Sequence, residues 1–434
     1  MRILFVAPSA YLLGGVQDWL YSITLGLRNK GHDVNVAVPN NEYHNGILYN
    51  NHYVGLNATF FTNQTGSSQG RIKALSRLLL NNPTDIIVGV NIGDIYEAYK
   101  CVYHRLQGTK IVMSLHAIEG DYFGDIGKYS QLLDGVITTN KLTQRLVTRL
   151  NLIDDDSIFY APYGVPTSKA REKEDQDNIL RIAWVGRLEN EQKRILDIPF
   201  ILQSLDRLNV EYTLSIAGDG PCKDKLVQNL YPWINMNRVK LMGFLDKRQL
   251  DTFYKQHNIL LITSVWETGP IVAWEAMLSG LVVVSSEYLG AASESALINE
   301  QTALLFPVGS NEAAARQLAR LIEPEQRNKL ATNGRQLAMS RYSIDSSLAS
   351  WEQAFYKIMR SKPKAMRCYV RTHSIEKSGR LDSILGPYIS EFIRTCVRRK
   401  GYCRDPGSEW PHSNYCKSNP KAFLEYAQSL EKDL

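Results

Sequence analysis

Short apolar runs alternate with amphipathic segments along most of the chain. In its first part, runs rich in Ile, Leu and Val predict buried strands, and segments with a helical apolar period separate several of them. The clearest helical segments are Gln17–Lys30 and Gln69–Asn81. The strands predicted in this part are Arg2–Ala7, Asp33–Val38, Asp85–Val90, Lys110–Leu115 and Gly135–Thr139.

A second set of strands begins after Ile179, beyond a polar stretch at 166–177 that has the composition of a linker. Two doubly wound, Rossmann-like βαβ domains facing a cleft are therefore expected, with ligands beyond the carboxyl ends of the strands. The strands of the second set are Leu180–Val185, Tyr212–Ala217, Val239–Leu241, Ile259–Thr263, Val282–Ser285 and Ala303–Phe306.

The segment Glu267–Glu275, Glu-Thr-Gly-Pro-Ile-Val-Ala-Trp-Glu, carries the most informative chemistry. It predicts a loop after a buried strand, then a helix from near Ile271 to Gly280. One carboxylate lies in the loop and the other about one turn into the helix, and N–H groups at the helix start favour a phosphate. This combination indicates a pocket for a nucleotide-linked sugar. The alternative is a helix with an acidic first turn and a Glu on its exposed face.

Two cations follow the strand Leu180–Val185. Arg187 comes directly after it, and Lys193 lies six residues further on. Fixed cations in this position stabilise a departing nucleoside diphosphate without a metal ion. The alternative is that Lys193 and Arg194 begin a solvated helix, and Arg194 could share the role of Lys193.

The predicted first domain offers a glycine pair and a histidine. Gly14 and Gly15 follow the first strand, where backbone without Cβ atoms can approach a phosphate or a sugar, although a plain turn is the alternative. His116 ends the strand Lys110–Leu115, and a single His at such a place is more often structural than catalytic.

Several of these motifs, in this order, resemble the family 4 retaining glycosyltransferases and their Glu-x7-Glu signature. The resemblance covers roughly residues 1–360 of 434. Besides Glu267–Glu275, it rests on Arg2–Pro8, Gly14–Val16, Lys30–Val34, Val185–Leu188 with Lys193, Ala217–Pro221 and Gly243–Leu245.

The resemblance implies the GT-B fold and a metal-independent transfer of a sugar, with retention, from a nucleotide-diphosphate sugar to a hydroxyl acceptor on a glycan, a lipid or a small molecule. By the same resemblance, Glu275 holds the ribose, Glu267 holds the sugar hydroxyls, and His116 lies near the donor sugar. The implied catalytic residues are His116, Arg187, Lys193 and Glu267. The implied donor-binding residues are Gly14, Gly15, Arg187, Lys193, Gly269, Ile271, Val272 and Glu275. A UDP-sugar is the expected donor, and neither a cofactor nor a metal is expected.

The expected organisation is an acceptor-side domain at 1–165, a donor domain at 179–345, a crossover helix at 346–360 and a C-terminal extension at 361–434. Two other functions stay open. A nucleotide-sugar epimerase of the same fold would use the same donor pocket, and a non-catalytic nucleotide-sugar-binding subunit would bind without reacting.

Composition agrees with a large cytoplasmic enzyme. Apolar residues make up 44% and charged residues 22% of the chain, and no apolar run is long enough to span a bilayer. The apolar start after Arg2 is too short for a signal peptide and reads as a strand. Six cysteines at irregular spacing show no disulfide framework.

The net charge of +6 lies entirely in the extension, where 14 Lys and Arg face 8 Asp and Glu, whereas residues 1–360 carry 36 of each. A helical stretch at 384–399 mixes apolar residues with a basic end. It could lie on an anionic membrane, bind a partner or pack on the body; a solvated face is the favoured expectation, and nucleic acid is not expected. Cys396, Cys403, His412 and Cys416 have irregular spacing for zinc, so free thiols are expected.

Overall fold

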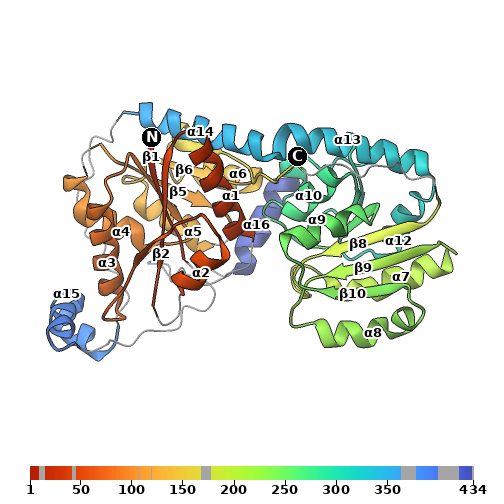
Figure 1. The fold of residues 1–434 in the computed structure, drawn as a ribbon, viewed down its shortest axis with the longest axis horizontal. Coiled ribbons are helices and arrows are strands. Elements are labelled where there is room, and N and C mark those ends of the chain that lie inside the picture. Colours follow the sequence, from red (N-terminus) through yellow and green to blue (C-terminus); the bar gives the residue numbers. More distant parts are fainter. Residues whose placement is uncertain are drawn as a thin grey trace. The chain divides into compact units, whose positions relative to one another are not determined.

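The structure of the chain, a computed structural model (Figure 1), describes residues 1–8, 15–41, 45–106, 108–118, 120–167, 177–362, 378–398 and 420–432. The chain divides into two compact units. Unit 1 comprises Met1–Ala161 and Leu348–Tyr426, and unit 2 comprises Pro162–Ser347 and Ala427–Leu434.

Unit 1 is built on a sheet of seven parallel strands in the order β3-β2-β1-β4-β5-β6-β7. The five predicted strands of this part are confirmed, and the structure adds two that the sequence did not predict, β3 and β7. Each of these has only three residues, too few to show an apolar period. The strands are β1 (Arg2–Val6), β2 (Asp33–Pro39), β3 (Thr59–Phe61), β4 (Ile86–Val90), β5 (Lys110–Leu115), β6 (Gly135–Thr138) and β7 (Ile158–Tyr160).

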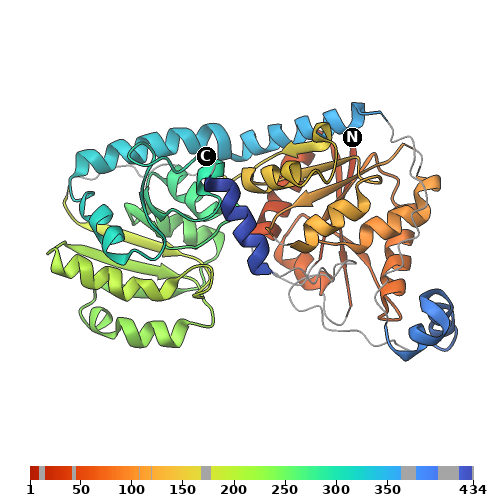
Figure 2. The ribbon, with the colours of Figure 1, turned by 180° about the vertical axis from the view of Figure 1, so that it is seen from behind.

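Helices cover both faces of this sheet: α1 lies in front of it in Figure 1, and the orange and yellow helices lie in front of it in Figure 2. Helix α14 (Ile344–Arg360) begins in unit 2 and continues in unit 1. The other helices are α1 (Gly15–Asn29), α2 (Gly46–His52), α3 (Ser68–Asn81), α4 (Asp94–Val102), α5 (Gly120–Tyr129), α6 (Lys141–Arg149) and α15 (Arg380–Cys396), with the 3₁₀ turns η1 (Tyr103–Arg105) and η2 (Asp155–Ser157).

Unit 2 contains six parallel strands in the order β10-β9-β8-β11-β12-β13, and all six were predicted. The strands are β8 (Leu180–Val185), β9 (Tyr212–Ala217), β10 (Val239–Gly243), β11 (Ile259–Ile262), β12 (Val282–Ser286) and β13 (Ala303–Phe306). The helices are α7 (Ile198–Arg207), α8 (Lys223–Asn235), α9 (Lys247–Lys255), α10 (Ile271–Ser279), α11 (Ala291–Glu294), α12 (Asn311–Ala319) and α13 (Pro324–Tyr342), with the 3₁₀ turn η3 (Ile195–Asp197). Helix α16 (Pro420–Lys432) begins in unit 1 and belongs to unit 2 from Ala427 on.

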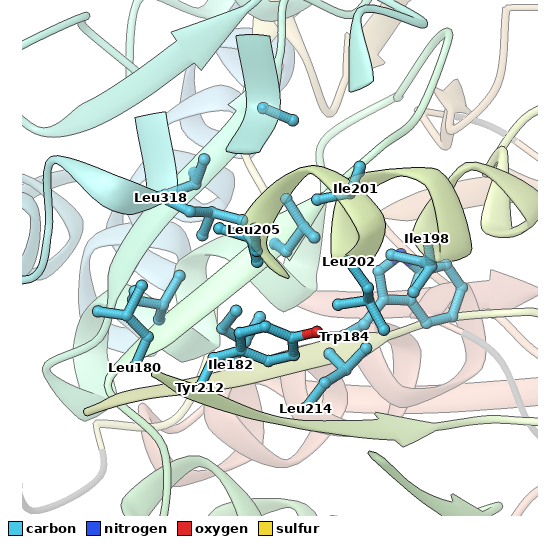
Figure 3. Packing of buried hydrophobic residues seen from close by; sticks show 14 of the residues in the cluster. Leu180, Ile182, Trp184, Ile198, Ile201, Leu202, Leu205, Tyr212, Leu214 and Leu318 are labelled. Atoms are coloured by element: carbon cyan, nitrogen blue, oxygen red, sulfur yellow. The ribbon is translucent and has the colours of Figure 1, made fainter. Parts of the chain in front are cut away.

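The core of unit 2 packs the apolar side chains of β8 and β9 against α7 and α12 (Figure 3). Parallel strands covered on both faces need apolar side chains in both directions, which explains the continuous apolar runs in the sequence. Strand β8 is thereby held firmly, and the loop that follows it starts from a fixed point. The labelled members of this core are Leu180, Ile182, Trp184, Ile198, Ile201, Leu202, Leu205, Tyr212, Leu214 and Leu318.

Both units have the strand order of doubly wound sheets, in which the order reverses between two neighbouring strands. In unit 2 this reversal falls between β8 and β11, and ligands of such sheets bind beyond the carboxyl ends at that point. Among the described helices, none combines the length and the apolar character needed to cross a membrane.

Candidate functional site

The loops that follow β8 and β11 meet at the strand-order reversal of unit 2. The N–H of Val265 donates to the carbonyl of Gln192 at 2.7 Å, and the amide of Gln192 donates to the carbonyl of Trp266 at 3.0 Å. The hydroxyl of Thr263 donates to the carbonyl of Lys193 at 2.6 Å. These contacts hold the two loops side by side, so that residues 70 or more positions apart in the chain belong to one site.

Lys193 and Glu267 form an ion pair across these loops. Lys193 Nζ lies 2.6 Å from Glu267 Oε1, and Ser264 Oγ donates to the same oxygen at 2.5 Å. The side chain of Glu267 is 7% exposed and that of Lys193 is 20% exposed. Within the described part of the chain, Glu267 Oε2 accepts no hydrogen bond. One carboxylate oxygen is thus fixed, and the other is available to a ligand.

Glu189 shapes the loop that carries Lys193. Its carboxylate accepts hydrogen bonds from the N–H groups of Glu191 at 2.8 Å, Gln192 at 3.1 Å and Lys193 at 2.8 Å. The sequence analysis did not identify this residue, although an acidic side chain that begins a tight turn is a known way to bind successive N–H groups.

The neighbouring Arg194 is engaged elsewhere. Its guanidinium pairs with Asp197 at 2.7 and 3.1 Å. The idea that Arg194 shares the role of Lys193 therefore has no support in its contacts.

Arg187 is exposed and, among the residues that the structure describes, has no ion-pair partner. Its backbone is nevertheless fixed, since the N–H of Leu188 donates to the carbonyl of Asp219 at 2.9 Å. Gly218, with φ of 140°, packs so closely that a Cβ there would lie 1.9 Å from the carbonyl oxygen of Gly186. The turn around Gly218 therefore fixes the backbone beside Arg187, whose side chain is exposed.

Helix α10 confirms the helix predicted from Ile271 to Gly280. It starts after Pro270 without a side-chain cap, and Gly280 ends it in the left-handed conformation. The first N–H groups of such a helix, including those of Ile271 and Val272, have no partner within the helix. Gly269 precedes them with φ of 95°, which glycine adopts without strain. This uncapped start suits an anion.

Glu275 lies one turn inside α10, as predicted. Its Oε2 accepts a hydrogen bond from the hydroxyl of Tyr254 in α9 at 3.1 Å. Burial, and then the negative charge of Glu275, raise the pKa of Tyr254 well above its usual value, so this tyrosine stays protonated and remains a donor. The contact of Tyr254 with Glu275 was not predicted from the sequence, because nothing in a local pattern pairs α9 with α10.

The C-terminal helix α16 also reaches this region. The carboxylate of Glu431 accepts hydrogen bonds from the N–H groups of Gly290 at 2.8 Å and Ser293 at 2.9 Å. The same loop contacts the site, since the N–H of Glu267 donates to the carbonyl of Leu289 at 3.1 Å. Glu431 lies 141 residues after Gly290, and no sequence pattern indicated this contact.

The predicted residues of the first domain belong to unit 1. Gly14 lies outside the described residues, and Gly15 is the first residue of α1. His116 follows β5, is buried, contacts Ser114 Oγ through Nε2 at 2.9 Å, and packs its ring 4.6 Å from that of Trp19. Burial lowers the pKa of His116 to about 3, so its imidazole is neutral at physiological pH.

The possible zinc ligands Cys403, His412 and Cys416 lie outside the described residues, and Cys396 is a free, exposed thiol on α15. In the part of the chain that the structure describes, no group of three or more His, Cys, Asp or Glu side chains could hold a metal ion.

Comparison with known families agrees with the geometry of unit 2. Residues 167–337 match the family description "Glycosyl transferases group 1". This segment contains β8–β13 and Arg187, Lys193, Glu267 and Glu275. The matched segment lies within unit 2.

Curated relatives match this chain over limited segments. An uncharacterized glycosyltransferase of Methanocaldococcus jannaschii is 35% identical over 115 residues, which cover 26% of this chain and 29% of that protein. A glycogen synthase of Mycobacterium tuberculosis is 28% identical over 184 residues, which cover 42% of this chain and 43% of the enzyme. The match thus spans less than half the length of these curated relatives.

Solved structures resemble a larger part of the chain. HepE of Anabaena, solved in complex with UDP and glucose, has a TM-score of 0.64 over 82% of this chain and 99% of its own, at 18% identity. At this identity the likeness shows the fold alone. The predicted fold class, two Rossmann-like parallel-sheet units of the GT-B type, is confirmed, whereas membership of family 4 stays a prediction.

Proposed function

We propose that this protein transfers a sugar, with retention of configuration and without a metal ion, from a nucleotide-diphosphate donor to a hydroxyl acceptor. The observation that carries the proposal is the Lys193–Glu267 pair at the strand-order reversal of unit 2, with Glu267 Oε2 unused by the described residues and the uncapped start of α10 following in the chain. The pair and the helix start provide donors and acceptors for both halves of a nucleotide sugar.

The phosphate half is assigned to Arg187, Lys193 and the first N–H groups of α10. Negative charge grows on the diphosphate as the bond to the sugar breaks, and fixed cations and N–H groups stabilise that charge. The ammonium of Lys193 has three N–H donors, so it can keep its contact with Glu267 and still donate to a phosphate oxygen. The guanidinium of Arg187 is exposed for a second contact.

The sugar half is assigned to Glu267, and the ribose to Glu275. Glu267 Oε1 is held by Lys193 and Ser264, which orients Oε2 to accept hydrogen bonds from sugar hydroxyls. Tyr254 holds Glu275 in the same manner. Carboxylates held in this way are preorganised, so that little ordering is needed when the donor binds.

The proposed reaction needs no protein nucleophile. The bond between the anomeric carbon and the phosphate oxygen breaks, a bond from that carbon to the acceptor oxygen forms on the same face, and the acceptor proton passes to the departing phosphate oxygen. His116, being neutral, is proposed to serve as a hydrogen-bonding group for the donor sugar and not as a charged acid.

UDP is the proposed nucleotide product of the reaction. HepE of Anabaena was solved with UDP and with UDP-glucose, and this fold likeness supports a UDP-sugar as the first donor to test. The proposed acceptor is a compound with a free hydroxyl group.

Calorimetric binding of UDP, GDP, ADP and CDP, with and without a chelator, tests the donor site. We expect selective, chelator-resistant binding that Glu275→Ala weakens, whereas Glu312→Ala, at an exposed position on α12, leaves it unchanged. Turnover of the matching nucleotide sugars then tests the chemistry, with NMR reading the anomeric configuration of the product. Binding of none of the four nucleotides, or a product of inverted configuration, contradicts the proposal.

A further inference from the structure

Helix α15 of unit 1 buries its polar side and exposes its apolar side. Asp382, Ser390, Glu391 and Arg394 are all 5% exposed or less. An amphipathic helix of a globular protein normally turns its apolar stripe toward the core, so the orientation of α15 is the reverse of the usual one. The helix lies beside α3 in both views (Figures 1 and 2).

A network of polar contacts fixes this orientation. The carboxylate of Glu391 accepts hydrogen bonds from the hydroxyls of Thr65 at 2.8 Å and Ser67 at 2.5 Å, just before α3. Just before α15, Ser378 Oγ accepts a hydrogen bond from the N–H of Ser68, the first residue of α3, at 3.0 Å. These contacts attach both ends of the helical segment to the same loop.

A buried ion pair completes the attachment. Arg394 Nη2 lies 2.6 Å from Asp382 Oδ1 and donates to the carbonyl of Ser378 at 2.9 Å. The pair bridges the interruption of the helix at Gly386 and Pro387, and it neutralises the charge of both side chains. The buried polar contacts therefore determine which face of α15 points outward.

The outward face carries large apolar side chains. Ile384 is 78% exposed, Tyr388 64% and Phe392 68%, and Leu385, Ile389 and Val397 are also exposed. Both acidic residues of 378–398 are buried and paired, so the exposed charges of this segment are those of Arg380 and Arg398. The outward face is apolar with basic ends and has no exposed carboxylate. The face that was expected from the sequence to be solvated is exposed in the structure, and it is apolar.

We propose that the outward face of α15, formed by Ile384, Leu385, Tyr388, Ile389, Phe392 and Val397, docks on an anionic membrane surface. Aromatic and aliphatic side chains flanked by cations are the composition of helices that lie in the membrane interface. The charge agrees: the whole +6 of the chain lies in residues 361–434, whereas residues 1–360 are neutral. Basic residues next to an apolar face add attraction to anionic headgroups. The inference concerns binding alone and does not depend on the proposed transferase activity.

Vesicle co-sedimentation of the full-length protein tests this docking. The probes are vesicles of phosphatidylcholine alone and of phosphatidylcholine mixed with phosphatidylglycerol. We expect binding to the anionic vesicles that weakens with salt, and the triple variant Ile384→Ser, Tyr388→Ser, Phe392→Ser to lower the partition coefficient at least about tenfold. All three side chains are exposed, so the thermal unfolding of the variant should match that of the wild type; if it does not, Phe392→Ser alone is used.

The matched control replaces exposed apolar residues of unit 2, Tyr231→Ser, Met236→Ser and Phe244→Ser, and should bind the vesicles like the wild type. The proposal is overturned if the wild-type protein does not co-sediment with anionic vesicles, or if the triple variant binds them as tightly as the wild type. A concentration-dependent dimer in sedimentation velocity that the triple variant abolishes, without vesicle binding, overturns it in favour of a second copy of the chain.

Discussion

Replacing Lys193 by alanine removes one partner of a pair whose other partner, Glu267, is almost fully buried. At 2.6 Å and an effective dielectric constant of about 20, the attraction is on the order of 6 kcal/mol. Desolvation of the two groups offsets most of it. Because the Lys193 side chain is 20% exposed, we expect the loss of stability to be about 2 kcal/mol, below the roughly 3–5 kcal/mol typical when a fully buried pair is broken.

A double-mutant cycle separates the pair from its surroundings. Lys193→Ala, Glu267→Gln and the double variant are unfolded by denaturant. The loss of unfolding free energy in the double variant should be smaller than the sum of the two single losses by about 1–2 kcal/mol. In the transfer reaction, Lys193→Ala should lower kcat by roughly 10²–10³, as expected when a fixed donor to developing charge is removed. The affinity for UDP should fall as well.

Arg194→Ala is the matched control for Lys193→Ala, because it removes the adjacent cation, which is paired with Asp197. It should leave the affinity for UDP unchanged. Stability losses of Lys193→Ala and Glu267→Gln that add within about 0.5 kcal/mol would refute the coupling. A Lys193→Ala protein with wild-type affinity for UDP would refute the assignment of Lys193 to the phosphate.

Three further variants test other parts of the site. Arg187→Ala should weaken UDP binding at least about tenfold in calorimetry while changing stability by less than about 0.5 kcal/mol, because its exposed side chain forms no ion pair with a described residue; undiminished binding contradicts its role. Gly218→Ala should cost at least about 2 kcal/mol in denaturant unfolding, since its Cβ would lie 1.9 Å from Gly186 O, and an unchanged midpoint would show that the turn can move. The lowered pKa of His116 means that the unfolded state binds more protons between pH 6.5 and about 3. The free energy of unfolding of the wild type should therefore decrease as the pH is lowered from 6.5 to about 3, by up to about 1.4 kcal/mol per pH unit. His116→Asn should make this pH dependence shallower, and equal pH dependence in the two proteins would refute the lowered pKa.

Most strands that the sequence predicted carry largely buried apolar runs: every residue of β4 and β5 is buried, although β10 is partly exposed. Strands β5, β8 and β13 match their predicted bounds. β3 and β7 lie at the two edges of their sheet and have three residues each, so neither burial nor length leaves a readable pattern.

The positions of the charged residues could be predicted, but their contacts could not. Arg187 and Glu267 follow β8 and β11, and a parallel doubly wound sheet brings the ends of such strands to one edge. The oxygen of Glu267 that Lys193 contacts depends on the rotamers of both side chains and on the hydrogen bond from Ser264. Glu431 enters through a helix near the end of the chain, and its contact follows from tertiary packing alone.

Helix α15 shows the same limit in another form. The apolar period of its sequence predicts an amphipathic helix, and the usual rule then places the apolar side inward. The structure instead matches the carboxylate of Glu391 to two hydroxyls before α3, and Arg394 to Asp382. A buried carboxylate is tolerated only where such donors exist, so the partner loop and not the helix decides which side faces outward. The period of a sequence therefore gives the two sides of a helix, and the polar groups of its neighbour determine which side is left exposed.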